Sequence, residues 1–305
     1  MSRATLEIDR QLPVDEQIFL DHIAHFVRDR DAATKALARA GFAPTPLSIQ
    51  VNPDPAGGAP QPTGTGNVTA MFTRGYIEVL FKTSDTPLSR ELDVALRRYP
   101  GVHLAAFAVA DATAAHRRLS DAGFRTRPIA HMQRPVETPD GMGGTAAFTL
   151  ARLEPGEMRE GRIQILTHRT EHMMWQPRWL THPNGALALT HITFAVADVT
   201  EAAERFARFI GRPSAPSSNG QTIALDRGRV ELVTPEALAA ALPELAIPAT
   251  LPFAGAYGVR VRSFGPLAEL MARAGLSARP HENELIAPFP PELGYGAWIF
   301  TETPA

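Results

Sequence analysis

Four segments of the chain repeat one order of hydrophobic and polar positions. Each begins with alternating or nearly continuous apolar residues, which predicts a strand, and continues with apolar residues at helical spacing up to a glycine. The segments begin at residues 20, 102, 189 and 256, and the first reads LDHIAHFVRDRDAATKALARAGF. The sequence therefore predicts one strand–helix unit that occurs four times.

Further strand-like runs, rather than another helix, follow each of these helices. In the first repeat, residues 42–49, 67–73 and 75–83 read as three strands, and residues 52–67 between them read as a long loop rich in Pro and Gly. The repeat is thus larger than a strand–helix pair. We predict four βαβββ modules and an α+β fold class.

Two histidines occupy the same position in different modules. His22 and His191 each stand seven residues before the aspartate of a Val-x-Asp sequence that ends the first strand. His103, in the second module, stands eight residues before its aspartate. Because a one-residue slip reverses the face of a strand, His103 points the same way as His22 only if the strand bulges.

The last strands of the modules also match, through a Gly-x-x-(Glu/Gln) pattern. Glu78, Gln164 and Glu231 share one position in it, whereas the fourth module has only apolar residues there and Tyr257 in place of the histidine. Histidine on the first strand and a carboxylate on the last can aim at one cation in a curled sheet. Imidazole plus carboxylate suits divalent Zn, Ni, Fe or Mn.

Composition narrows the classes of function. Lys and Arg number 30 against 32 Asp and Glu, so no excess of positive charge predicts nucleic acid or a membrane surface as partner. The 305 residues include no Cys, which removes disulfides, thiolate metal sites and Cys nucleophiles. The N-terminal residues MSRATLEIDRQLPVDEQ have no apolar segment of a targeting signal. We expect a soluble cytoplasmic protein with a small-molecule substrate.

The motifs resemble a known superfamily. Modules with LDHIAHFV in the first strand and GYIEVLF in the last resemble the vicinal oxygen chelate superfamily, which includes glyoxalase I, extradiol ring-cleaving dioxygenases and bleomycin-resistance proteins. Together with GTGN at 64–67 and THRTEHMMWQPRWLTHPNGA at 167–186, they are similar to proteins with a glyoxalase-like domain.

The resemblance implies that successive modules pair into two domains, each with a half-open β-barrel cup. The expected domains are residues 17–174 and a second, degenerate pair at 189–305, with a linker at 175–188. In the first cup it implies a divalent metal held by His22, Glu78, His103 and Gln164. Gln164 departs from the pattern, because the superfamily's best-known members have Glu at that position.

The implied function is a metal-dependent isomerase or lyase for a small substrate with two adjacent oxygens, with Glu78 as metal ligand and catalytic proton carrier. His168, Trp175 and Asn67 are the predicted substrate-binding residues. Alternatives are an Fe(II)-dependent extradiol dioxygenase, a metal-free binding or resistance protein, and an inactive scaffold. A homodimer is compatible with the modules, which can pair between chains as well as within one.

Two further positions remain open at this stage. His25 falls on the strand face opposite His22, which favours packing over a role in binding. His191 and Glu231 repeat the His/Glu pair, and we interpret them as a decayed second site. The alternative is that modules one and three meet and pool His22 and Glu78 with His191 and Glu231.

Overall fold

The computed structural model describes residues 10–52, 54 and 56–303, so the first nine residues of the predicted N-terminal segment lie outside it. Its strands are β1 Ile18–Phe26, β2 Ser48–Asn52, β3 Gln61–Met71, β4 Tyr76–Lys82, β5 Gly101–Val109, β6 Ala130–Val136, β7 Gly144–Ala151, β8 Arg162–His168, β9 Ala186–Ala195, β10 Ala215–Ser217, β11 Gly220–Ala224, β12 Arg229–Val233, β13 Phe253–Val261, β14 Arg279–His281, β15 Glu284–Pro288 and β16 Ala297–Glu302. Its helices are α1 Arg30–Arg39, α2 Pro87–Arg98, α3 Ala112–Asp121, α4 Glu171–Met174, α5 Val199–Ile210, α6 Pro235–Ala241 and α7 Phe264–Arg273, with short 3-10 turns η1 Pro177–Trp179 and η2 Pro291–Leu293.

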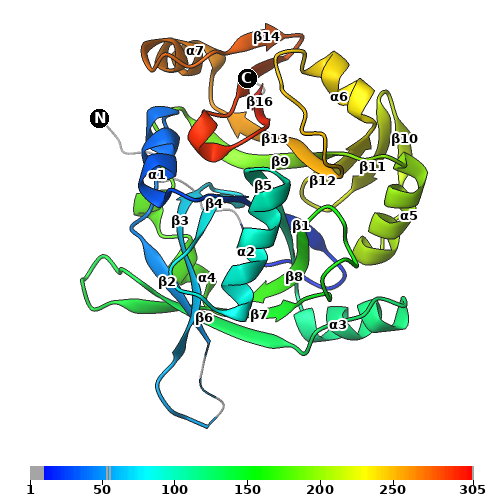
Figure 1. The fold of residues 1–305 in the computed structure, drawn as a ribbon. Helices are drawn as coiled ribbons and strands as arrows, with labels where there is room; N and C mark the ends of the chain where they lie inside the picture. The colour runs from blue at the N-terminus through cyan, green and yellow to red at the C-terminus, as the bar shows by residue number, and fades with distance from the viewer. Residues whose placement is uncertain (1–9, 53, 55, 304–305) are drawn as a thin grey trace.

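The first two modules form a closed barrel, in the order β1-β4-β3-β2-β6-β7-β8-β5 (Figure 1). Within each module the first strand is parallel to the last, as β1 is to β4 and β5 is to β8. The two modules meet where β1 runs antiparallel to β5 and where β2 pairs with β6. This arrangement places the first and last strands of both modules side by side.

The third and fourth modules form an open sheet of eight strands, in the order β10-β11-β12-β9-β13-β16-β15-β14. Here the first strands β9 and β13 pair in the centre, and the outer strands of the two modules do not meet. The predicted α+β fold class with paired βαβββ modules is confirmed. The half-open cup describes the second pair better than the first, because the pairing of Val51 with Gln133 closes the first pair.

The first module departs from its sequence prediction at the loop. We expected residues 52–67 to be irregular, but β3 already begins at Gln61. Its first half alternates Thr with Gly, and the buried hydroxyls of Thr63 and Thr65 hydrogen-bond to each other at 2.7 Å. The backbone bonds and β-branched residues of this run outweigh the turn tendency of its glycines.

Helix α2 is an addition to the module that the repeat did not predict. It begins with a capping box between Thr86 and Ser89 and has Pro87 in its first turn, both of which favour helix initiation. Leu92 and Leu96 on its apolar face pack into a cluster with residues of the barrel interior such as Leu80 and Leu104. The helix therefore covers one end of the barrel (Figure 1).

The two sheets share a core. The largest cluster of buried apolar side chains includes residues of both, and Phe42 of the barrel module contacts Trp298 of β16 with ring centroids 5.4 Å apart. His25 is fully buried between the sheets, where its Nε2 bonds the Tyr257 hydroxyl at 2.8 Å and its Nδ1 bonds the Leu293 carbonyl oxygen at 2.9 Å. His25 is thus a packed residue of this interface.

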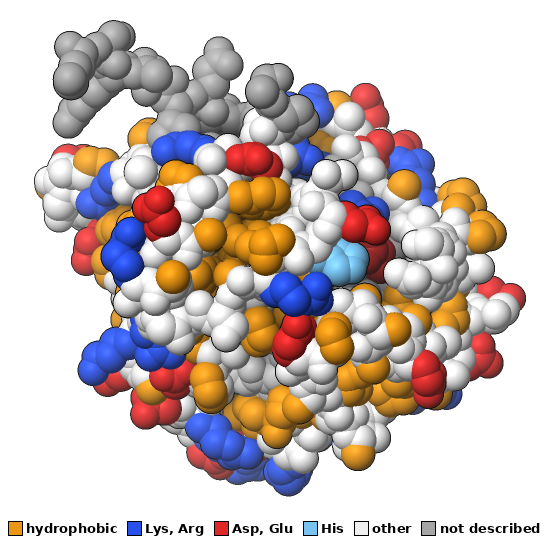
Figure 2. Space-filling model, turned by 90° about the horizontal axis from the view of Figure 1, so that it is seen from above, with side chains coloured by type: hydrophobic (Ala, Val, Ile, Leu, Met, Phe, Trp, Pro, Cys, Tyr) orange, Lys and Arg blue, Asp and Glu red, His pale blue; other side chains and the backbone are white. Residues whose placement is uncertain are grey.

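The face drawn in Figure 2 gives no indication of a strongly charged partner. Seen from above, over the second sheet, acidic and basic side chains are interspersed among apolar ones without an extended area of one sign (Figure 2). Within the described residues, no helix combines the length and the hydropathy that a membrane crossing needs.

A buried ion pair joins α5 to the barrel. Arg205 donates from Nη1 to Glu160 Oε2 at 2.6 Å and from Nη2 to Glu160 Oε1 at 3.0 Å, and the Glu160 side chain is fully buried. Glu201, four residues before Arg205 on the same helix, adds a half-exposed second partner. Removing one member of such a pair leaves a desolvated charge behind.

We expect Glu160→Ala to lower the free energy of unfolding by about 3 kcal/mol, because Arg205 then loses its buried partner. Urea denaturation at neutral pH measures this change. Arg125→Ala, which breaks the exposed pair with Glu157, serves as the control and should cost less than about 1 kcal/mol. Equal decreases in the free energy of unfolding of the two variants would contradict the prediction, because burial would then add nothing to the contribution of the Glu160 pair.

Candidate functional site

The interior of the barrel holds a small polar cavity, here called the inner cavity, of about 50 Å³. Apolar side chains such as Leu80, Leu104 and Phe148 form part of its wall. Its polar lining comes from strands of both modules and consists of His22, Gln50, Asn67, Tyr76, Glu78, Gln133, Arg134, Arg152, Arg162 and Gln164. A space of this size holds one or two groups the size of a water molecule, not a whole substrate.

His22 is held in one orientation by Asp21. The pairing of β1 with β5 shifts register between Leu20 and His22, so Asp21 is an extra residue at a bulge. Its carboxylate accepts from His22 Nδ1 at 2.7 Å and from His168 Nε2 at 2.9 Å. The Tyr76 ring stacks on the His22 ring with centroids 4.5 Å apart. Because Nδ1 carries the proton, the neutral ring presents an unprotonated Nε2 to the cavity.

Asp21 is an ionised group in a fully buried place. Burial alone raises the pKa of its carboxyl, but the charge and hydrogen bond of His168, and then those of His22, outweigh burial. The net result holds the pKa of Asp21 well below its usual range. The two imidazoles are therefore bound to a carboxylate, which fixes the donor nitrogen of each.

Glu78 faces His22 across the cavity. Its Oε1 accepts hydrogen bonds from Asn67 Nδ2 and, at 3.3 Å, from Gln50 Nε2. Its Oε2 lies 3.8 Å from His22 Nε2, which is too long for a hydrogen bond. Two strong ligand atoms thus face each other while the rest of each side chain is held by other residues.

The other predicted ligands are placed differently. Gln164 lines the inner cavity, but its Oε1 accepts from Arg152 Nε at 3.3 Å. His103 does not line this cavity: its Nε2 bonds the Tyr99 carbonyl oxygen at 2.7 Å, its ring stacks on Tyr99, and burial lowers its pKa to about 4. The structure therefore brings His22, Glu78 and Gln164 together without His103.

The register of β5 explains the position of His103. The inward position seven residues before Asp111 belongs to Leu104, which pairs with Ala24 and lines the cavity. A bulge between Leu104 and Val102 leaves His103 unpaired at that point, but it does not turn the ring toward His22. The expected bulge in β5 therefore exists, but His103 does not face the inner cavity. No group of three or more His, Cys, Asp or Glu side chains with metal-binding geometry occurs within the described residues.

Arginine is an unexpected component of the inner cavity. Arg134, Arg152 and Arg162 line it, against a single carboxylate from Glu78. Arg162 is paired with Glu91 at 3.1 Å, whereas Arg152 donates to Gln164 and to the Met132 sulfur. Burial lowers the pKa of Arg152 to about 9. The cavity wall is thus electropositive and favours a negatively charged occupant.

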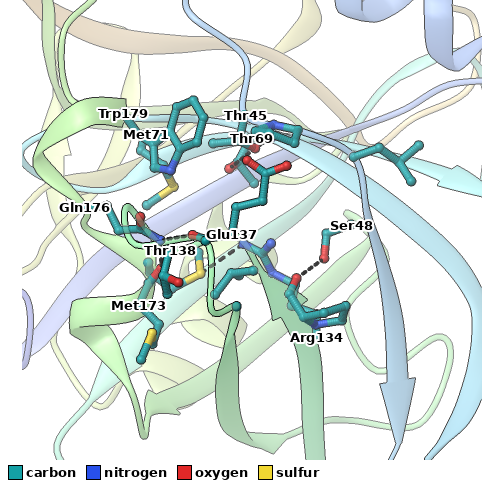
Figure 3. A pocket seen from close by; sticks show the side chains of 17 residues that line it. Thr45, Ser48, Thr69, Met71, Arg134, Glu137, Thr138, Met173, Gln176 and Trp179 are labelled. Carbon is teal, nitrogen blue, oxygen red and sulfur yellow. Dashed lines mark hydrogen bonds between the residues drawn. The ribbon is translucent and has the colours of Figure 1, made fainter.

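A larger pocket of about 480 Å³, here called the outer pocket, shares Arg134 with the inner cavity (Figure 3). Met71 of β3 and the segment after β8 contribute apolar walls, including Met173 and Trp179. The volume is that of a small-molecule site. The segment after β8, which we expected to be a linker from residue 175, therefore covers part of the barrel mouth.

Of the three predicted substrate-binding residues, only Asn67 lines the inner cavity. His168 and Trp175 lie behind it: His168 binds Asp21, and Trp175 contacts the His168 and Tyr76 rings and donates from Nε1 to the Phe72 carbonyl oxygen at 3.1 Å. The side chains of His168 and Trp175 thus position residues that line the cavity or contact its lining.

The second His/Glu pair belongs to the open sheet. His191 and Glu231 line a pocket of about 600 Å³ formed by the third and fourth modules, where Glu231 is bonded to Arg229 and Thr193. Burial lowers the pKa of His191 to about 4. His22 and Glu78 line the inner cavity, whereas His191 and Glu231 line this other pocket, so the structure does not bring the two pairs into one site.

Sequence reasoning missed Asp21, Tyr76, Arg134 and Arg152. In a regular strand Asp21 would lie on the face opposite His22, so only the bulge brings the two side chains together. Tyr76 offered a signal, because it precedes Glu78 by two residues and shares its strand face. Arg134 of β6 and Arg152, the residue that follows β7, carried no signal at all.

We expect Asp21→Asn to lower the free energy of unfolding by about 3 kcal/mol at pH 7, because two buried imidazoles lose an ionised partner. Because folding lowers the pKa of Asp21, its carboxylate stabilises the fold fully at pH values above the unfolded pKa of 3.8. This contribution is lost as the pH falls below that value. The difference between wild type and variant should therefore shrink below about pH 4. Urea titrations from pH 3 to 7 measure it, and a difference that does not change with pH contradicts the assignment.

Comparison with solved structures supports the fold. A hypothetical protein from Staphylococcus aureus matches with TM-score 0.62 and 9% identity over 94% of this chain and 100% of that one. A mutant of 4-hydroxymandelate synthase from Streptomyces coelicolor gives 0.54 and 13% over 95% and 94%, and the Mn(II)-bound glyoxalase from Novosphingobium aromaticivorans gives 0.53 and 11% over 94% and 82%. At these identities the likeness shows the fold alone.

A search of curated proteins finds no match. The family model described as glyoxalase-like domain matches residues 20–210, which cover the barrel and continue through β9 and α5. This span is more than half of the chain and includes His22, Asn67 and Glu78. The chain belongs to the glyoxalase-like domain family, within the vicinal oxygen chelate superfamily.

Proposed function

We propose that the protein is a metal-dependent enzyme of isomerase or lyase type, which acts on a small substrate whose two adjacent oxygens enter the inner cavity while the rest of the molecule lies in the outer pocket. The observation that carries the proposal is the facing pair of His22 Nε2 and Glu78 Oε2, 3.8 Å apart in a buried cavity. The Mn(II)-bound glyoxalase is a structural neighbour with a metal, and it supports the class of cofactor without fixing the reaction.

The residues present fit a divalent cation held by two protein ligands. The Asp21 carboxylate accepts a hydrogen bond from His22 Nδ1, an arrangement that orients a ligating histidine and raises its basicity. Glu78 keeps Oε2 available while Asn67 and Gln50 bond Oε1. Zn, Ni, Fe and Mn accept imidazole plus carboxylate, and a site with open positions takes its other ligands from water and substrate. We do not count Gln164 and His103 among the ligands, because both are bonded elsewhere.

The cation would supply a positive charge that binds both substrate oxygens and stabilises negative charge developing on one of them. Within the chain, Glu78 is the carboxylate that would take a proton from the substrate and return it to a neighbouring atom. Asn67 Oδ1 is buried without a hydrogen-bond partner in the described part of the chain, so it can accept from a substrate hydroxyl. Leu80 and Leu104 limit access of water.

The dioxygenase alternative requires two histidines and one carboxylate in a common site. Among the described residues, His22 is the one histidine that lines the inner cavity, so this alternative has the weaker support. A metal-free binding protein remains the second candidate. It is favoured by one observation, the three arginines in a cavity that would otherwise hold a cation.

We expect wild-type protein dialysed against Mn²⁺, Zn²⁺, Ni²⁺ or anaerobic Fe²⁺ to retain about one equivalent of one of these metals. His22→Ala and Glu78→Ala should each lose it, because each removes one of only two charged or imidazole ligands. Metal content is measured by inductively coupled plasma mass spectrometry after removal of free metal.

His103→Ala is the matched control, since it removes a buried histidine of the same barrel that points elsewhere. It should retain the metal. Retention by His22→Ala, or loss by His103→Ala, would show that the ligand set is misassigned. Absence of metal in the wild type with all four cations would favour the metal-free binding protein.

A further inference from the structure

Arg134 is a buried cation without a carboxylate partner in the described residues. Its side chain is 7% exposed, and the hydrogen bond that the structure gives for its guanidinium runs from Nη2 to the Met174 sulfur at 2.9 Å. A thioether is a weak acceptor, so most of the five N–H donors of this arginine are not satisfied by it. A desolvated charge in this situation is costly unless a ligand supplies the counter-charge.

The position of Arg134 is at a junction. It lines both the inner cavity, with His22 and Glu78, and the outer pocket (Figure 3). Burial lowers the pKa of Arg134, and the charges of Tyr76 and Glu78 oppose that effect, so its guanidinium lies within the field of the inner cavity. A group bound to Arg134 is therefore presented to the facing pair of His22 and Glu78.

The outer pocket complements a ligand with an apolar part. Met71, Met173 and Trp179 line it, and sulfur and indole surfaces adapt well to an aromatic or branched alkyl group. Its acidic side chain, Glu137, is exposed to solvent, where its charge is screened. The pocket of about 480 Å³ has the volume of a small-molecule site, whereas the inner cavity of about 50 Å³ accepts only a head group.

We propose that the substrate is a carboxylic acid with an apolar substituent, whose carboxylate binds Arg134 and whose substituent occupies the outer pocket. The planar fork of a guanidinium matches a carboxylate with two parallel hydrogen bonds. The small inner cavity favours a carboxylate over the bulkier phosphate. This inference deepens the proposed function, because it names the substrate class for the same site, but its test needs no metal and no turnover.

Phenylacetate is the probe, and isothermal titration calorimetry on the full-length protein without added metal measures its binding. We expect wild type to bind phenylacetate, and to bind the neutral isostere phenylacetamide at least about tenfold more weakly, since a charge-assisted pair contributes more than a neutral hydrogen bond. Arg134→Met should weaken phenylacetate by a similar factor. Arg134→Lys should fall between, because it keeps the charge and loses the fork.

Arg178→Met is the matched control. Arg178 is exposed beside the outer pocket, over the Trp179 ring, so its loss removes the same long-range charge without touching the inner cavity. It should change phenylacetate binding by less than about threefold. Thermal unfolding of Arg134→Met completes the set: because Arg134 has only a sulfur acceptor, its replacement should not lower the melting temperature.

Three outcomes overturn the proposal: no phenylacetate binding by wild type at millimolar concentration, equal binding of phenylacetamide, or unchanged binding in folded Arg134→Met. An equal loss in Arg178→Met does the same, because it would reduce the effect to net charge. Loss of metal binding in the dialysis experiment leaves all of these measurements intact. Failure of the metal site and failure of carboxylate recognition are thus separate results.

Discussion

The buried carboxylate of Asp21 is the constraint on which the arrangement of the site depends. It stands at a bulge in β1, accepts a hydrogen bond from His22 on one side and from His168 on the other, and thereby decides which nitrogen of His22 faces the cavity. Without an ionised partner, His22 could rotate or change tautomer inside the barrel. Trp175 and Tyr76 then pack against the two imidazoles and keep the network away from water.

Closure of the first module pair encloses this network in a cavity and does not leave it in an open groove. The pairing of β2 with β6 joins the free edges, α2 fills one end with Leu92 and Leu96, and the segment after β8 narrows the other. The low dielectric that results strengthens every charge interaction inside. The low dielectric also explains why the charges of Arg134 and Arg152, which water would solvate on a surface, favour a ligand of opposite charge here.

The second module pair consists of the same kind of βαβββ modules but forms an open sheet. Its sheet stays open, and its His191 and Glu231 face a wide pocket. In the fourth module Ile299 stands where the first module has Glu78, and the neighbouring Trp298 donates to the buried Tyr257 hydroxyl at 2.7 Å. The Tyr257 hydroxyl also bonds His25, so a position that could hold a ligand in one module here joins the two sheets.

The sequence by itself determined the module count, the α+β class and the first-module residues His22, Asn67 and Glu78, because strand periodicity and local spacing fix which side chains share a face. It did not determine where His103 points, since one residue of register reverses a strand face, nor that Asp21 would reach His22 through a bulge. It gave no indication of Arg134, which comes from a strand far along the chain. Those features depend on how strands of separate modules pair, and long-range pairing is decided only when the barrel closes.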